Sequence, residues 1–377
     1  MPGACARRAA PAPRRVPVRG RAGGRGQRHV LRLPQRDRDP GGGPVTTAAA
    51  RRSAALSSRI AGFPFPFRAD TYRYSTNVEP ARVPVATEAG GWGGGILDID
   101  GEYAAELAER ERILAADPTR LTVLPHMRPA CWDALRTLLR ELAAQHPDMM
   151  ELRRDGDELV WRNELLGIEQ RFRDGDDDTL PGGPLGFLGS QIQDDIVLLD
   201  QREGSLWADA GLVTFAADWS LHFDVGMRFL EVHGPVPRVH EEGVISRAER
   251  FLMRLQPGQE YRRTNWTMSV DRRLDQSTEV YPLWGRDRRL IAEAPADELA
   301  ERLQLRVEVQ HLIRLGASGA VLFLIRTYLL SLAELAQVPA WRTRFGRVLA
   351  ELPDDMAEYK GLTRFRRAAA DWLLPDS

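Results

Sequence analysis

The stretch LRVEVQHLIRLGASGAVLFLIRTYL, residues 305–329, predicts two β-strands joined by a tight turn. Gly316 and Gly319 bound the turn, and the apolar run 320–325 is typical of a buried strand. Side chains alternate between the two faces of a strand, so the residues of the first strand divide into two groups. Val307, Val309 and His311 share one face, while Arg306, Glu308 and Gln310 share the other.

Elements on both sides of this hairpin predict an α+β fold. Helical or strand periodicity divides the chain into helices from Tyr103, over 128–146 and over 244–258, strands over 158–172, 195–219 and 259–270, and a closing helix over 331–352. Ser331 and Glu334 have the spacing of a capping box at the start of the closing helix. Helices first, an antiparallel sheet in the middle and helices last, with no internal repeat, predict one α+β domain.

The N-terminal 44 residues are rich in Arg, Gly and Pro and have almost no apolar periodicity. They lack the continuous apolar segment of a secretory signal and the interleaved aromatic residues that stack on nucleic-acid bases. We therefore expect residues 1–59 to be a disordered or mis-annotated extension, with translation starting near Val45. Residues 60–377 are expected to form a single domain.

Composition excludes several classes of protein. The chain has 377 residues, 43% of them hydrophobic, and a net charge of -1, which gives no general attraction to nucleic acid or to an anionic membrane. No apolar run reaches the length of a membrane span, and 2 cysteines do not make a disulfide framework. A cytoplasmic protein is expected. Lys360 is the only lysine, and arginine supplies the rest of the positive charge.

Two histidines flank a rigid step in EVHGPVPRVH, residues 231–240. Pro235 and Pro237 restrict the backbone, and a rigidly held imidazole is what an axial metal ligand needs. A surface loop without chemistry is the alternative. His233 follows apolar residues and is the candidate ligand, whereas His240 precedes two glutamates and is expected to be solvated.

Charged residues on the predicted strands form the remaining candidates. Asp194 and Asp195 start an apolar strand and point to opposite faces, so one of them needs a cation or hydrogen-bond donors on the inner side. A purely structural pair that meets Arg is the alternative. Four strand arginines could form internal salt bridges or bind the propionates of a haem: Arg262, Arg263, Arg306 and Arg326. Common hydrolase and zinc motifs are absent from the sequence.

Five landmarks occur in order along the chain: WGGGILDIDGEY at 92–103, IQDDIVLL at 192–199, TFAADWSLHFDVGMRFLEVHGPVP at 214–237, RRTNW at 262–266, and the hairpin at 305–329. Together they resemble the haem-dependent oxidative N-demethylase family, specifically its haem-bearing alpha subunit, over roughly residues 60–372. The resemblance implies a PAS-like antiparallel sheet flanked by helices that holds haem b. It also implies an oxidoreductase that demethylates a small secondary amine such as dimethylamine with O2. Electrons would come from NADPH through flavin and iron–sulfur reductase subunits.

The resemblance also implies site residues. His233 is the histidine of the family's His-x-Pro-Val-Pro motif, and so the expected axial ligand of the iron. Asp194 is the expected catalytic carboxylate, which pairs with the substrate ammonium and positions its methyl group. Many relatives carry Glu in place of Asp194, and the dimethylamine enzyme carries Arg in place of Ser220. The substrate pocket is therefore expected to differ from that of the dimethylamine enzyme.

Two other classes of function stay open from the sequence. One is a haem-binding PAS-type sensor or carrier without turnover, and the other is a scaffold that has lost haem. A polar residue that faces the haem favours the enzyme, and a wholly apolar distal cavity favours the sensor.

Overall fold

The computed structural model describes residues 56–238 and 243–374, so His240 and nearly all of the N-terminal extension lie outside the described part. The α-helices are α1 (Ser58–Ala61), α2 (Tyr103–Ala116), α3 (Arg128–Gln145), α4 (Gly183–Gly189), α5 (Leu221–Asp224), α6 (Phe229–Val232), α7 (Val244–Met253), α8 (Tyr281–Leu290), α9 (Ala296–Arg302), α10 (Leu332–Leu335), α11 (Pro339–Glu351), α12 (Asp354–Tyr359) and α13 (Arg366–Leu373). Short 3-10 helices are η1 (Pro118–Arg120), η2 (Pro125–Met127), η3 (Asp177–Thr179), η4 (Thr278–Val280) and η5 (Ile291–Glu293).

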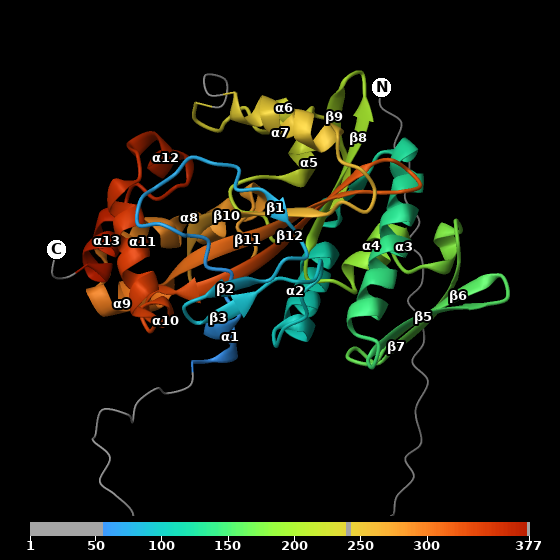
Figure 1. The fold of residues 1–377 in the computed structure, drawn as a ribbon, viewed down its shortest axis with the longest axis horizontal. Helices are drawn as coiled ribbons and strands as arrows, with labels where there is room; N and C mark the ends of the chain where they lie inside the picture. Colours follow the sequence, from blue (N-terminus) through green and yellow to red (C-terminus); the bar gives the residue numbers. More distant parts are fainter. Residues whose placement is uncertain (1–55, 239–242, 375–377) are drawn as a thin grey trace, which may run out of the picture. The chain divides into compact units, whose positions relative to one another are not determined.

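The strands are β1 (Glu79–Pro80), β2 (Val85–Thr87), β3 (Gly90–Trp92), β4 (Leu121–Val123), β5 (Met150–Asp155), β6 (Glu158–Asn163), β7 (Ile168–Arg173), β8 (Asp195–Arg202), β9 (Ser205–Leu212), β10 (Tyr261–Val270), β11 (Leu303–Arg314) and β12 (Val321–Ser331). Seven of them form one antiparallel sheet in the order β1-β10-β11-β12-β8-β9-β4. A β2–β3 hairpin and a three-stranded β5-β6-β7 sheet are separate. The expected antiparallel sheet with flanking helices is confirmed (Figure 1).

The β11–β12 hairpin is the centre of the large sheet. β11 pairs with β12 from Gln304↔Ser331 to Arg314↔Val321, and every residue of β11 is buried. Directly opposed residues of an antiparallel pair lie on the same face, so the register assigns each side chain to a face. We call the face that carries Val197 and Phe323 the α6 face, and the face that carries Ile196 and Leu324 the α2 face.

Different helices cover the two faces of the sheet. On the α6 face, Val197 and Leu312 pack with side chains of α5, α6 and α7 in one apolar cluster. On the α2 face, Ile196 and Leu324 pack against α2, α3 and α4, and a second cluster around Leu305 packs against α9–α13. Figure 1 shows α6 and α7 above the sheet, α2 below it, and α9–α13 gathered at the left. No helix within the described ranges is long and apolar enough to span a membrane.

Two predicted elements differ in the structure. The closing helix predicted over 331–352 is two helices, because Pro339 has no amide hydrogen and begins α11 instead of continuing α10. The capping box is confirmed, with Glu334 N 3.1 Å from Ser331 Oγ and Ser331 N 3.0 Å from Glu334 Oε2. The single strand predicted over 158–172 is the β6–β7 hairpin, whose turn contains Gly167 at φ +66°.

Candidate functional site

His233 directly follows α6 and lies among residues that pack on the α6 face. Its ring is half-buried and packs against the ring of Phe229 with centroids 4.3 Å apart. Nδ1 is 2.8 Å from the carbonyl oxygen of Phe229, one turn earlier in the chain. A carbonyl oxygen only accepts hydrogen bonds, so Nδ1 carries the proton and the lone pair is on Nε2.

The remaining ring nitrogen is suited to bind a metal. Burial lowers the pKa of His233 from 6.5 to about 4, with a further decrease from the positive charge of Arg263. The imidazole is therefore neutral at physiological pH. Within the described chain, the hydrogen bond to Phe229 is the only one that the ring makes. A histidine whose Nδ1–H is held by a backbone carbonyl presents Nε2 in one direction, as metal-binding histidines do.

Contacts on both sides also hold the Pro-Val-Pro step. Val236 N donates to the carbonyl oxygen of His233 at 3.1 Å, and the hydroxyl of Tyr74 donates to that of Pro237 at 3.1 Å. Arg238 forms an ion pair of 2.9 Å with Asp355 of α12. The rigidity expected from the prolines is therefore supplemented by Phe229, which sets the ring direction and was not among the residues predicted for the site.

Polar side chains of β10 and β11 line the α6 face near His233. Gln310 lies opposite Arg263, and Glu308 lies opposite Asn265. Arg263 Nη1 donates to Gln310 Oε1 at 3.0 Å and Nε donates to the carbonyl oxygen of Thr76 at 3.1 Å. Burial lowers the pKa of Arg263, and Glu308 opposes this change. Arg263 is close enough to His233 for its positive charge to lower the pKa of the imidazole.

Lys360 joins the same group of residues from the C-terminal end of α12. Its Nζ donates to the carbonyl oxygen of Trp266 at 2.6 Å and lies 4.7 Å from the centre of the Trp266 ring. Burial lowers the pKa of Lys360 to about 8, Glu308 opposes the decrease, and Arg263 adds to it. Lys360 was not selected from the sequence as a site residue. Its being the only lysine among 52 basic residues was the available signal.

Arg306 also lies on the α6 face, but its guanidinium forms hydrogen bonds and an ion pair within the protein. It is fully buried, and Nη1 donates to the carbonyl oxygen of Leu274 at 2.8 Å. Nη2 donates to the carbonyl oxygen of Phe215 and to Thr327 Oγ1, and Nε lies 3.6 Å from Glu308 Oε1. These contacts leave Arg306 poorly placed to bind a ligand carboxylate.

The register places Asp194 and Arg326 on the opposite side of the sheet. Ile325 pairs with Asp195, so Arg326 and Asp194, the next residues on each strand, face the α2 side. There Arg326 binds Asp100 at 2.8 Å and Glu106 at 2.7 Å. The structure therefore brings His233 and Arg263 together, and separates Asp194 and Arg326 from them by the thickness of the sheet.

Asp194 and its neighbour Asp195 have contrasting environments. Asp195 accepts hydrogen bonds from Thr214 N at 2.9 Å and Phe215 N at 2.8 Å and pairs with Arg110 at 3.1 Å. Asp194 is only 1% exposed, and neither of its oxygens has a hydrogen-bond partner within the described part of the chain. Burial raises the pKa of Asp194 from 3.8 to about 7, although Arg326 and Arg110 oppose the increase.

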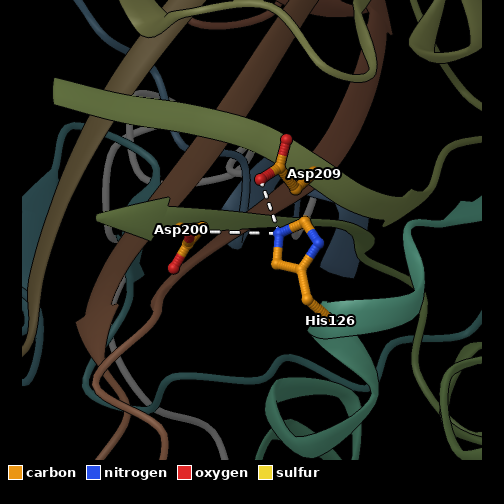
Figure 2. A group of neighbouring side chains, drawn as sticks. All are labelled: His126, Asp200 and Asp209. Atoms are coloured by element: carbon orange, nitrogen blue, oxygen red, sulfur yellow. Dashed lines mark hydrogen bonds and ion pairs between the residues drawn. The ribbon is translucent and has the colours of Figure 1, made fainter. Parts of the chain in front are cut away.

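A separate cluster has the composition of a metal site. His126, Asp200 and Asp209 present ligand atoms within 4.8 Å of one another, and Figure 2 shows the imidazole directed at both carboxylates. His126 Nε2 lies 2.9 Å from Asp209 Oδ2 and 3.9 Å from Asp200 Oδ2. The guanidinium of Arg202 already binds both aspartates, so it occupies the position that a cation would take. This cluster is a salt-bridge network of the protein.

The α6 face thus offers a neutral imidazole with an open nitrogen near the half-buried guanidinium of Arg263. A haem site needs one axial nitrogen ligand and one or two cations for the propionates, so this donor set fits a haem group. The molecule is accordingly an α+β protein with an imidazole and a guanidinium on one face of its central sheet.

A family model described as "Haem-dependent oxidative N-demethylase, alpha subunit-like" matches residues 93–370. The chain belongs to this family, which confirms the resemblance seen in the sequence. The family is one of haem-dependent oxidoreductases, and the description as an alpha subunit implies further subunits.

Proposed function

We propose that this chain binds haem b through His233 Nε2 and catalyses the oxidative N-demethylation of a small secondary amine in the cytoplasm. The observation that carries the proposal is the hydrogen bond of 2.8 Å between His233 Nδ1 and the carbonyl oxygen of Phe229, which leaves Nε2 as the lone-pair nitrogen. When bound, haem supplies the chemistry that activates O2 for oxidation of the substrate methyl group. Electrons are proposed to come from NADPH through flavin and iron–sulfur partner subunits.

The topology supports the PAS-like fold that the resemblance implies. Five neighbouring strands of the sheet, β9-β8-β12-β11-β10, form an antiparallel unit. Helices α5, α6 and α7 are inserted between β9 and β10 and cover the α6 face. His233 lies in this insertion, directly after α6.

Polar residues on the α6 face favour an enzyme over a gas sensor. Glu308, Gln310 and Asn265 lie on the same face as Arg263, so that face is not wholly apolar. Asp194, the carboxylate that the resemblance suggested for the substrate, faces the other side of the sheet. We therefore include His233 and Arg263 in the proposed site and leave Asp194, Arg306 and Arg326 out of it.

The test is the absorption spectrum of the full chain expressed with a haem precursor. We expect a Soret band in the wild type and its loss in His233→Ala, with an unchanged circular dichroism spectrum. His222→Ala is the matched control, because His222 is exposed on α5, and its Soret band should equal that of the wild type. A band that survives in His233→Ala would refute the ligand assignment, and no band in the wild type would refute haem binding.

A further inference from the structure

We propose that Lys360 and Arg263 form a two-cation clamp for the two propionates of the haem, with Lys360 as the second anchor. This inference rests on the proposed function, because it concerns the same ligand. Lys360 lies outside the motifs that suggested the family, and its role follows from its position in the fold.

The first argument is that both cations lack an ionic partner. Neither Arg263 nor Lys360 lies within 4.0 Å of a carboxylate in the described part of the chain. Glu308 is the carboxylate that opposes the pKa decrease of both cations, but it already pairs with Arg306 at 3.6 Å. Other basic residues near the site have partners of their own: Arg288 binds Asp218 and Arg238 binds Asp355. Arg263 on the α6 face and Lys360 at the β10 edge of the sheet therefore each carry a positive charge without a neighbouring carboxylate among the described residues.

The second argument is the cost of that arrangement. Arg263 and Lys360 are half-buried, and charges that lose contact with water are normally paired, because removing an ion from water is expensive. Burial lowers the pKa of Arg263 and the pKa of Lys360. The positive charge of Arg263 lowers the pKa of Lys360 further, because the two cations repel each other. A ligand with two carboxylates placed between them would neutralise both charges. Haem b carries two propionates, one for each of these two cations.

The third argument is that donors remain available. Arg263 uses Nε and Nη1 for Thr76 and Gln310, and no hydrogen bond of Nη2 to a described residue is present. Lys360 has three donors on Nζ and uses one of them for Trp266. The segment 74–76 links the clamp to the proposed iron ligand: the carbonyl oxygen of Thr76 accepts from Arg263 Nε, and the hydroxyl of Tyr74 donates to the carbonyl oxygen of Pro237, in the turn that follows His233.

Haem dissociation from the loaded full chain tests the clamp. Transfer of haem to an excess of apomyoglobin gives the dissociation rate, and we expect Lys360→Met to lose haem roughly ten- to a hundredfold faster than the wild type, as for a lost hydrogen bond to a charged group. Lys360→Arg retains a cation and should restore most of the difference. Arg289→Met removes an exposed cation of α8 and should leave the rate unchanged.

A second readout uses the single lysine. Acetylation with a small active ester, mapped by peptide mass spectrometry, reports on Lys360 separately from the terminal amine. Lys360 should react in the apo chain and be protected in the haem-loaded chain. Loss of haem from Lys360→Met at the wild-type rate would overturn the clamp, whatever the labelling shows. Absence of a Soret band in the wild type would instead refute the proposed function itself.

Discussion

Replacing Asp194 by Asn should stabilise the protein, and the gain should depend on pH. The carboxyl group is 1% exposed, and neither oxygen has a hydrogen-bond partner in the described structure. Burial raises its pKa from 3.8 to about 7. The protonated form is thus the one that the fold accommodates, and asparagine has nearly the same shape without an ionisable group.

The sign and size follow from proton linkage. Between pH 3.8 and about 7 the folded state keeps the proton of Asp194 while the unfolded state has lost it, so unfolding releases a proton. The free energy of unfolding therefore falls as pH rises through this range and is constant above it, as far as Asp194 is concerned. Three powers of ten in proton affinity correspond to about 4 kcal/mol, which is the upper limit of the expected gain.

The assay is urea denaturation of wild type and variant, followed by tryptophan fluorescence at a series of pH values from about 4 to about 8. The difference in unfolding free energy should be close to zero at the acidic end and largest at the alkaline end. Asp195→Asn is the control: Asp195 accepts from Thr214 N, Phe215 N and Arg110, so this variant should be destabilised at every pH. A difference for Asp194→Asn that does not change with pH would refute the reasoning.

Two further predictions concern the scaffold. Gly93→Ala should destabilise more than Gly156→Ala: both residues have positive φ, at +72° and +66°, but only at Gly93 would a Cβ meet Arg262 Nη1, at 2.0 Å. Thermal or urea unfolding should show a cost of about 1–2 kcal/mol for Gly156→Ala and a further loss of roughly 1.5–3 kcal/mol for Gly93→Ala, and equal costs would contradict the clash. Ser331→Ala should cost about 1 kcal/mol through loss of the cap on α10, whereas Glu334→Gln, which can still accept from Ser331 N, should cost less in the same assay.

The sequence contained enough local information to predict the core of the fold. The division of β11 into Val307, Val309 and His311 on one face and Arg306, Glu308 and Gln310 on the other agrees with the register. The opposed directions of Asp194 and Asp195 also follow from the period of a strand. Pro339, the first residue of α11, is the feature of the sequence that marks the break after α10.

Which residues come together around His233 depends on contacts between segments that are far apart in the chain, and the pattern within one strand does not predict these contacts. Strand periodicity separates the two faces of each strand, but it does not say which face lies under α6. That choice is fixed by the pairing of Ile325 with Asp195 across two segments far apart in the chain. Lys360 approaches β10 from a helix about ninety positions later, and spacing along the sequence does not predict such a contact.

The contacts of Lys360 have another consequence for β10. β1 pairs only with Tyr261 and Arg262, so beyond Arg262 the edge of β10 that faces away from β11 has no neighbouring strand in the described part of the chain. Instead, Lys360 Nζ donates a hydrogen bond to the carbonyl oxygen of Trp266, and Asn77 Nδ2 donates one to the carbonyl oxygen of Thr264. An edge strand with unoccupied acceptors is a template for strand addition by another molecule. These two side chains thus block strand addition at the edge of β10. A chain truncated before α12 would lack Lys360, and this edge would then be more open to aggregation.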